Sequence, residues 1–334
     1  MTQAIRIGSR GSQLALWQAN HIAAELRSAG HTVEIEIIRT TGDRMQHPET
    51  GAPESDGLPS LAPLADGKGI FIKEIEEALA DGRIDLAVHS LKDLPTELDS
   101  RFTLAAIPPR ADARDAWVCE QYWALHTLPL GGRVGTTSPR RRAQPLALRP
   151  DLKFVELRGN VDTRLRKLAE GACDALVLAS AGLDRLGRTE SVHSRFAIEE
   201  LCPAPGQGAL ALETRAASYA VFSEPDRDEY VRKAVGALDH PETRFSIEVE
   251  RAVLDALGGG CSIPIGVHCS PIREGSETIG WTVHGQVLAP DGEAMIAVSA
   301  TAPASASTGA LALGVAEDLR SRGALDLLAG VVPE

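Results

Sequence analysis

The stretch GIFIKEIEEALADGRIDLAVHS, residues 69–90, determines how the chain is expected to fold. Its first half carries apolar residues at helical spacing and ends on Gly82, where glycine commonly terminates a helix. Its second half is a short apolar run, typical of a strand that is buried on both faces. A helix followed directly by such a strand is the repeating unit of an α/β sheet.

Similar patterns lie on both sides of this stretch. Residues 12–30 show helical periodicity, and Ser12 can cap the first turn. The apolar face of this helix holds Leu16, Ala19, Ile22, Ala23 and Leu26. Apolar, β-branched runs typical of strands occupy residues 32–39, 101–107, 132–137, 152–157 and 173–180. Their alternation with helices predicts open α/β sheets with both faces covered.

Two segments rich in proline and glycine, residues 106–114 and 201–210, interrupt this alternation. The residues between them contain strands and helices of their own. Beyond them lie a helical pattern at residues 241–257, a hairpin pattern around Pro290-Asp291-Gly292, and a last helical pattern at residues 308–322. This order predicts two α/β regions followed by a smaller α+β region.

Composition narrows the class of protein. The chain has 334 residues, 43% apolar and 24% charged, which is typical of a soluble globular protein with more than one domain. No apolar run approaches the roughly 20 residues of a membrane span, and the first residues lack the pattern of a signal peptide. The five cysteines show no metal-binding spacing, which predicts free thiols in a reducing cytoplasm and no metal site. A net charge of −12 disfavours nucleic acid as a partner.

Arginines recur just beyond the predicted strands. Arg6 and Arg10 flank the end of the first strand. Further arginines follow three other strands, namely Arg140, Arg141, Arg142, Arg158, Arg164 and Arg185. Ligands of open α/β sheets bind at the carboxyl ends of strands, and guanidinium groups pair with carboxylates or phosphates. A single such arginine is ordinarily a solvated surface residue, but the repeated location in an acidic protein favours a site for a small polyanionic ligand.

The strand within residues 83–90 leads into a polar group that comprises His89, Ser90, Lys92 and Asp93. Lys92 and Asp93 can form a local ion pair of little energetic value. Alternatively, Asp93 lies at the same edge as the arginines, where a lone carboxylate among cations can stabilise a positive intermediate or transfer a proton.

A run of three glycines precedes Cys261 in the stretch VLDALGGGCSIPIG, residues 253–266. Cysteine is often a small buried apolar residue, and glycines often end helices. The functional alternative is that a thiol on a glycine loop has no neighbouring side chains to block a bulky electrophile. This motif alone does not decide between the two.

Eight stretches, in order along the chain, resemble the porphobilinogen deaminase (hydroxymethylbilane synthase) family. They are IRIGSRGSQLALWQA, GKGIFIKEIEEAL, DLAVHSLKDLP, VGTTSPRRRAQ, LRGNVDTRL, LASAGLDRLG, PAPGQGALALE and GGGCSIPIG. The resemblance implies a cytoplasmic, monomeric transferase of tetrapyrrole (porphyrin, haem) biosynthesis. It also implies two α/β domains similar to type II periplasmic binding proteins and a smaller α+β domain. Their expected bounds are residues 1–108 with 209–236, residues 113–202, and residues 241–334.

The family's activity implies what the site residues would do. Four porphobilinogen molecules are condensed head to tail with loss of ammonia, and hydroxymethylbilane is then released by hydrolysis. A dipyrromethane cofactor, which the resemblance places on Cys261 through a thioether, primes the growing chain. Asp93 matches the catalytic aspartate, which would hydrogen-bond pyrrole N–H groups and offset the charge of a cationic intermediate.

Basic and hydroxyl residues complete the site that the resemblance implies. Those matched to cofactor binding are Lys92, Ser138, Arg140, Arg141, Arg158, Arg164 and Arg185. Those matched to substrate binding are Arg6, Arg10, Ser12, Lys68, Arg158 and Arg164. The acidic, proline-rich residues 43–67 occupy the place of the family's active-site lid, and we expect a loop there.

Two other classes of function are consistent with parts of the sequence. A two-lobed anion-binding protein would use the same fold without catalysis, but it would need neither Cys261 nor Asp93. Binding of nucleic acid through PRRRAQ, residues 139–144, conflicts with the acidic balance and the scarcity of aromatic residues.

Overall fold

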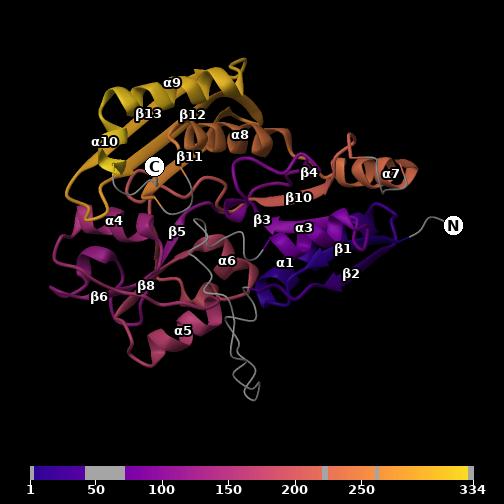
Figure 1. The fold of residues 1–334 in the computed structure, drawn as a ribbon. Coiled ribbons are helices and arrows are strands. Elements are labelled where there is room, and N and C mark those ends of the chain that lie inside the picture. The colour runs from indigo at the N-terminus through magenta and orange to yellow at the C-terminus, as the bar shows by residue number, and fades with distance from the viewer. Residues whose placement is uncertain (1–3, 42–71, 220–224, 260–262, 330–334) are drawn as a thin grey trace, which may run out of the picture. The chain divides into compact units, whose positions relative to one another are not determined.

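A computed structural model describes residues 4–41, 72–219, 225–259 and 263–329 of the chain (Figure 1). Its strands are β1 (Ile5–Ser9), β2 (Val33–Ile37), β3 (Leu86–Ser90), β4 (Phe102–Ala106), β5 (Asp115–Val118), β6 (Arg133–Gly135), β7 (Lys153–Val155), β8 (Ala175–Ala179), β9 (Ser194–Arg195), β10 (Leu210–Arg215), β11 (Ile265–Glu274), β12 (Glu277–Leu288) and β13 (Met295–Pro303). Its helices are α1 (Gln13–Ser28), α3 (Lys73–Ala80), α4 (Pro139–Leu148), α5 (Val161–Ala169), α6 (Ser180–Arg185), α7 (Pro225–Gly236), α8 (Pro241–Ala256), α9 (Thr308–Ser321) and α10 (Ala324–Leu328). Short 3-10 turns are η2 (Leu91–Asp93), η3 (Leu125–Thr127) and η4 (Thr189–Ser191). Within these ranges, no helix has the length and apolar character that crossing a membrane requires.

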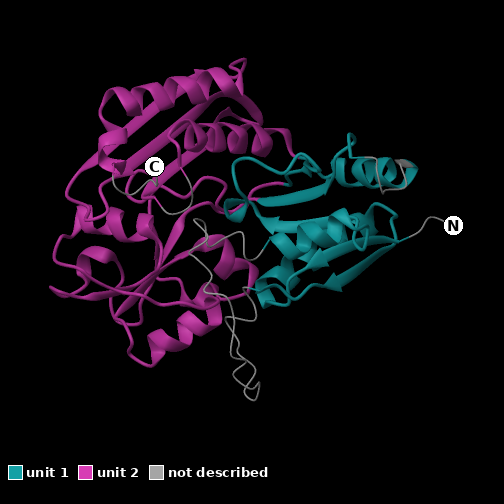
Figure 2. Ribbon diagram, viewed as in Figure 1, with its two compact units in different colours: residues 1–108, 210–239 teal, residues 109–209, 240–334 magenta. Residues whose placement is uncertain are grey.

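Contacts between residues divide the chain into two compact units (Figure 2). The first comprises residues 1–108 and 210–239, and the second comprises residues 109–209 and 240–334. The first unit is therefore discontinuous in sequence, with bounds close to those expected for the first domain. The second unit contains two separate sheets, and its further division into domains of residues 113–202 and 241–334 stays a prediction.

The first unit is built on a five-stranded sheet in the order β2-β1-β3-β10-β4. β1, β2 and β3 are parallel, while β10 runs antiparallel to both of its neighbours. Alternate residues of β3 face opposite sides, so that Leu86 and Val88 pack with α1 and α7, whereas Ala87 packs with α3. The helix and strand predicted within residues 69–90 are thus confirmed, and helices cover both faces of the sheet.

The helix ends also form as the local sequence predicts. Ser12 accepts a hydrogen bond from the backbone N–H of Ala15, 3.3 Å away, and so caps α1. After α3, Gly82 has a φ of 70°, in the left-handed region that glycine favours. Leu16, predicted on the apolar face of α1, is half-buried. The fully buried face of α1 comprises Gln18, Ala19, Ile22, Ala23 and Leu26.

The sheet within residues 109–209 repeats the topology of the first sheet. Its order is β7-β6-β8-β5-β9, with β6, β7 and β8 parallel and β5 antiparallel to both of its neighbours. In each sheet, three parallel strands are followed by one reversed strand and then an edge strand. Neither reversed strand, β5 nor β10, is evident from sequence periodicity. The repeated topology confirms the prediction of two α/β domains of the same class.

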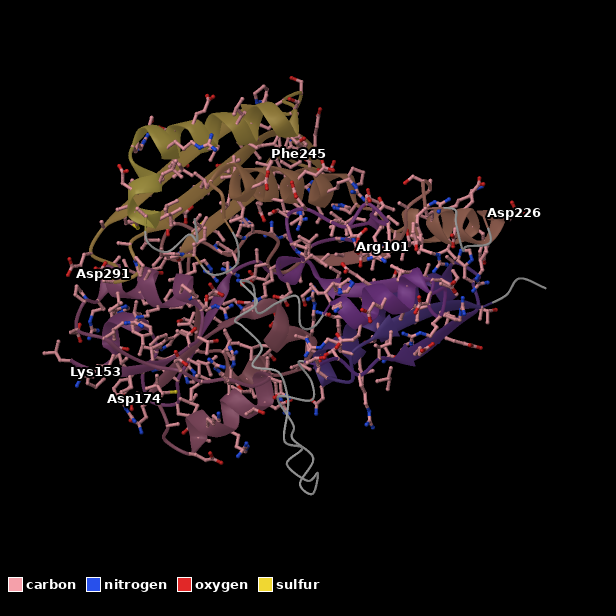
Figure 3. The ribbon with its side chains drawn as sticks, viewed as in Figure 1. Arg101, Lys153, Asp174, Asp226, Phe245 and Asp291 are labelled. Atoms are coloured by element: carbon pink, nitrogen blue, oxygen red, sulfur yellow. The ribbon has the colours of Figure 1, made fainter. Side chains whose placement is uncertain are left out.

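Residues 240–329 contain the predicted α+β region. β11, β12 and β13 form an antiparallel sheet on which α8 and α9 pack. Gly292, with a φ of 77°, lies in the turn between β12 and β13, which confirms the predicted hairpin. Phe245 on α8, labelled in Figure 3, stacks on Trp281 of β12, with ring centroids 3.9 Å apart. β11 is an additional strand that the sequence patterns do not predict.

Glu250 on α8 is fully buried, and its carboxylate forms hydrogen bonds with several segments of the second unit. Its carboxylate accepts hydrogen bonds from Arg110, at 2.6 and 3.1 Å, and from the backbone N–H groups of Gly206, at 2.7 Å, and Cys269, at 2.8 Å. Burial alone would raise the pKa of Glu250, but the charge of Arg110 and the ring of His268 lower it to about 2. The buried carboxylate is therefore ionised and paired at neutral pH.

Glu250→Ala should lower the free energy of unfolding by about 3–5 kcal/mol, because it leaves a buried guanidinium and two N–H groups without their acceptor. Glu248→Ala, at a more exposed position on the same helix, should change it by less than about 0.5 kcal/mol. Because the pKa of Glu250 is lowered, its stabilisation is present above about pH 4.5 and is lost as the pH falls toward about 2. Urea unfolding at about pH 7 and about pH 3 measures both effects. Equal stability of the two variants at neutral pH would contradict this role.

Candidate active site

The short turn Leu91–Asp93, called the Asp93 turn below, follows β3 directly. Lys92 and Asp93 in this turn are half-buried. Ser90, the last residue of β3, accepts a hydrogen bond from the side-chain amide of Gln18 on α1, at 2.7 Å. The Asp93 turn therefore follows a buried strand and lies at the carboxyl end of the parallel strands, as the sequence predicts.

Arg10 lies at the same edge of the same sheet. It follows β1, which pairs with β3 in parallel register, and its side chain is half-buried. Ser12 comes two residues later, at the start of α1, where its hydroxyl is the helix cap. The first unit therefore brings Arg10, Lys92 and Asp93 to one sheet edge, with Ser12 at the adjoining helix start.

Arg6 lies toward the opposite edge, and the prediction that it flanks the end of the first strand is wrong. It is the second residue of β1, and its guanidinium donates hydrogen bonds to Asp85 at 2.8 and 3.1 Å. Asp85 is buried just before β3 and also pairs with Arg215 and Arg227. Burial would raise the pKa of Asp85, but hydrogen bonds from Arg6 and Arg227 lower it to about 2. Arg6 therefore belongs to a structural ion cluster, and its role in binding substrate stays a prediction.

Arg140 and Arg141 lie in the first turn of α4, in the second unit. Both guanidinium groups bind the buried carboxylate of Asp115, each with a closest distance of 2.7 Å. Arg140 also donates to the backbone carbonyl of Cys202 at 2.7 Å. Burial would raise the pKa of Asp115, but the charges of the two arginines hold it well below its usual range. One buried carboxylate thus binds two cations.

Arg164 and Arg185 add two half-buried cations to the second unit. Arg164 on α5 donates to the carbonyl of Gly159 at 2.9 Å, and Arg185 at the end of α6 donates to the carbonyl of Gly208 at 2.7 Å. Burial, together with the nearby charge of Arg141, lowers the pKa of Arg164 to about 10. Burial likewise lowers the pKa of Arg185 to about 10. In the part of the chain that the structure describes, no carboxylate pairs with Arg164, so this position favours an anionic ligand.

The remaining predicted residues differ in their surroundings. The Ser138 hydroxyl accepts a hydrogen bond from the backbone N–H of Arg141 and caps α4. Arg158 follows β7 with its side chain 85% exposed, 3.8 Å from Glu156. Its role as a ligand-binding residue stays a prediction. Lys68, Cys261 and residues 43–67 lie outside the described residues.

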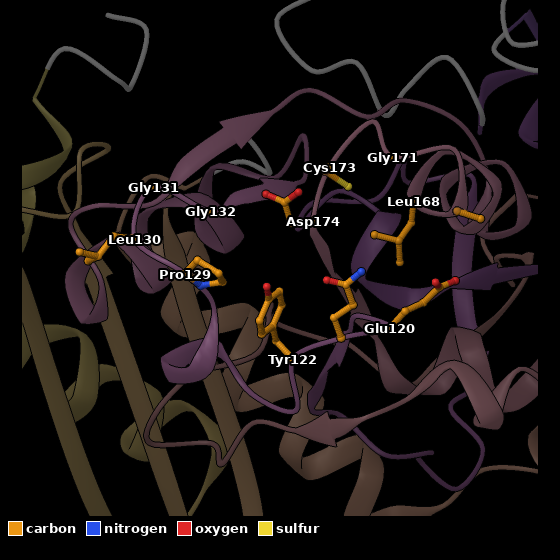
Figure 4. Close-up of a pocket in the computed structure, with 12 residues that line it drawn as sticks. Glu120, Tyr122, Pro129, Leu130, Gly131, Gly132, Leu168, Gly171, Cys173 and Asp174 are labelled. Atoms are coloured by element: carbon orange, nitrogen blue, oxygen red, sulfur yellow. The ribbon is translucent and has the colours of Figure 1, made fainter.

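A cavity of about 400 Å³ lies away from these residues, in the second unit (Figure 4). Its lining includes Gly132, just before β6, and Asp174, just before β8. These positions are at the amino ends of the parallel strands, whereas Arg158 follows a carboxyl end. Because the carboxylates of Glu120 and Asp174 line the cavity, it does not suit an anionic ligand.

The fold and these side chains define a class of protein. Two α/β sheets share one topology. One of the two units carries a carboxylate on a turn at the same sheet edge as Arg10, and the other carries several buried and half-buried guanidinium groups. Such residues suit a protein that binds, or acts on, a small ligand with several carboxylates.

Comparison with known families identifies this class. Residues 5–223 match the dipyrromethane cofactor-binding domain of porphobilinogen deaminase, and residues 245–321 match the C-terminal domain of that protein. The chain is 43% identical over 332 residues to the porphobilinogen deaminase of Chromobacterium violaceum, covering 99% of this chain and 98% of the relative. It is also 43% identical over 332 residues to that of Roseiflexus castenholzii, covering 99% of this chain and 100% of the relative. The chain belongs to the porphobilinogen deaminase family.

Solute-binding proteins are among the solved structures to which the chain is similar. The methionine-binding protein MetQ is 13% identical, with a TM-score of 0.41 over 70% of this chain and 94% of that chain. A periplasmic substrate-binding protein of an ABC transporter from Coxiella burnetii is 15% identical, with a TM-score of 0.38 over 69% of this chain and 91% of that chain.

Proposed function

We propose that this chain is a porphobilinogen deaminase. It condenses four porphobilinogen molecules head to tail with loss of ammonia, and it releases hydroxymethylbilane for tetrapyrrole biosynthesis. The observation that carries the proposal is the half-buried guanidinium of Arg164, which no described carboxylate pairs with and which lies within range of the charge of Arg141, in a member of this family. We place the enzyme in the cytoplasm as a monomer.

The described residues fit the family's dipyrromethane cofactor. The cofactor is built from two pyrroles that each carry an acetate and a propionate, so it needs cationic partners. Arg164 offers a half-buried guanidinium that no described carboxylate neutralises, and Arg140 and Arg141 share one carboxylate. Arg158 and Arg185, with Lys92 and Ser138, are the further residues proposed to hold it. When bound through Cys261, the cofactor supplies the pyrrole carbon from which the product chain grows.

Asp93 acts on the reacting pyrrole. When ammonia leaves porphobilinogen, the pyrrole becomes positively charged, and a half-buried carboxylate stabilises that charge more strongly than water does. The same carboxylate accepts hydrogen bonds from pyrrole N–H groups. Arg10 at the same sheet edge binds a carboxylate of the incoming substrate, with Ser12 and Lys68 as further proposed contacts.

Turnover of porphobilinogen by the purified chain tests this proposal. We expect porphobilinogen to be consumed and ammonia to be released in equal amounts, with one hydroxymethylbilane formed for every four substrate molecules. Saturable binding of porphobilinogen without release of ammonia would contradict the proposal and would indicate the anion-binding class instead.

Arg164→Ala should lower kcat/KM for porphobilinogen by about 10- to 100-fold, because a charged hydrogen bond in a half-buried place contributes about 1.5–3 kcal/mol. Arg142→Ala is the matched control, because Arg142 belongs to the same basic run but is exposed. It should change kcat/KM by less than about 2-fold. Steady-state kinetics of both variants measures the difference, and equal losses would show that Arg164 does not bind the ligand.

A further inference from the structure

Titratable side chains gather behind the Asp93 turn, on the face of the first sheet that α3 covers. His89 is the next-to-last residue of β3, and its Nε2 lies 3.1 Å from Oε2 of Glu213 on β10. The two side chains are only 7% and 0% exposed. The strand register explains why the two side chains are in contact. Ala211 of β10 pairs with His89 of β3, and Glu213 lies two residues farther along β10, on the same face of the sheet as His89.

Glu76 on α3 is the third member of this group. Burial and the charge of Glu213 raise the pKa of Glu76 to about 7, although His89 acts in the opposite direction. The second oxygen of Glu213, Oε1, is buried and accepts no hydrogen bond from the described residues. Glu76 thus lies on the helix that covers this face of the sheet, and its carboxyl group is within electrostatic range of Glu213 and His89.

Among the described residues, Asp99 and Arg101, which precede β4, also act electrostatically on Glu76. They pair with each other at 2.7 Å and are 40% and 39% exposed, so their opposite charges act on Glu76 in opposite directions (Figure 3 labels Arg101). On α3 itself, Lys73 and Glu77 form an exposed pair one turn apart. The proton on Glu76 is therefore governed mainly by its burial and by Glu213.

β3 connects this group of side chains to the Asp93 turn. His89 is held on the α3 side of the sheet by Glu213, and the next residue, Ser90, is held on the α1 side by Gln18. The Asp93 turn begins immediately afterwards. The end of β3 is thus fixed on both faces of the sheet, and its position determines where Lys92 and Asp93 lie.

We propose that Glu76 and the buried pair of His89 and Glu213 form a charged cluster that positions the Asp93 turn. While Glu76 is protonated, the cluster holds one carboxylate beside His89, and α3 packs closely on the sheet. When Glu76 loses its proton, a second carboxylate lies near Glu213, and the repulsion displaces α3 and the end of β3. Glu76 is a positioning residue in this account, and only the link to turnover rests on the proposed function.

The first experiment measures thermal stability against pH in two variants of the full chain. Because the pKa of Glu76 is raised from 4.5 to about 7, its ionisation costs stability as the pH rises through this range. Glu76→Gln, which resembles the protonated side chain, should melt about 2–4 °C above the wild type at about pH 8, and at the same temperature at about pH 5. Glu77→Gln, the same change at an exposed position of α3, should show no such pH-dependent difference. A Glu76→Gln variant that follows the wild type at every pH would overturn the cluster.

The second experiment follows the Asp93 turn itself. The backbone amide resonances of Lys92 and Asp93 should shift with pH, with a midpoint near 7 in the wild type and in Glu77→Gln. They should lose this transition in Glu76→Gln. Resonances that still titrate in Glu76→Gln, or that never titrate, would overturn the positioning role.

Kinetics then separates this inference from the proposed function. The kcat of the wild type should fall on the alkaline side with the same midpoint, and Glu76→Gln should move that fall upward by about one pH unit or more. If kcat of Glu76→Gln fell at the same alkaline pH as kcat of the wild type, the link between the cluster and turnover would be overturned. Absence of any turnover in the wild type would instead refute the proposed function, and the stability and resonance measurements would still decide the cluster.

Discussion

Cys261→Ser is expected to lower the turnover of porphobilinogen by more than about 10³-fold and to leave the chain without a covalent cofactor. A serine hydroxyl is a much poorer nucleophile than a thiolate toward an electrophilic carbon. The other cysteines cannot replace it, because Cys119, Cys173, Cys202 and Cys269 are all buried. Burial also raises the pKa of Cys202, and it raises the pKa of Cys173 to about 11 and of Cys269 to about 12.

Cys173→Ala is the matched control for this loss of a thiol. Cys173 lies in the lining of the cavity at the amino ends of β6 and β8, away from the candidate site. Its replacement should leave turnover within about 2-fold of the wild type. Substantial turnover in Cys261→Ser would show that another residue holds the growing chain.

Asp93→Asn is expected to lower kcat by about 10²- to 10³-fold, with a much smaller change in KM. The amide keeps the size of the carboxylate and one accepting oxygen, but it lacks the negative charge that is proposed to offset the cationic pyrrole. Because the arginines are proposed to provide most of the substrate binding, binding should be largely retained. Rapid-quench measurement of ammonia release in a single turnover separates this chemical step from binding.

Asp81→Asn makes the same chemical change at an exposed position directly after α3 in the first unit. It should leave kcat within about 2-fold of the wild type. If Asp93→Asn turned over like Asp81→Asn, a different group would have to stabilise the cationic intermediate.

The elements that the sequence predicts well are those with a strong local pattern. α1 has its cap at Ser12 and its apolar face within one helix, and α3 ends where Gly82 allows a left-handed turn. β5 and β10 are different, because each is assigned by pairing with strands far away in the chain. β10, for example, lies between β3 and β4, more than one hundred residues earlier in sequence, and all six of its residues are buried. No period of two can show in such a strand.

In the candidate site, too, the sequence predicts which residues are charged but not which distant residues they contact. The sequence identifies Arg140 and Arg141 as cations after a strand, and the structure places them there. It does not indicate that both bind Asp115, because that carboxylate comes 25 residues before Arg140 and carries no motif. The partner of Arg6 lies 79 residues away, and that contact explains why the predicted position of Arg6 at the ligand edge is wrong. The charge of a side chain can be read from the sequence, whereas the residue that it pairs with depends on the tertiary fold.

Under the proposed function, this chain carries its own dipyrromethane on Cys261, and intact-mass spectrometry of the purified chain with peptide mapping can detect it. We expect a mass above that of the sequence by two linked pyrrole units, with the whole increment on the peptide that contains Cys261. A chain that keeps its bare sequence mass after incubation with porphobilinogen, or that carries the increment on any other residue, would refute this role of Cys261.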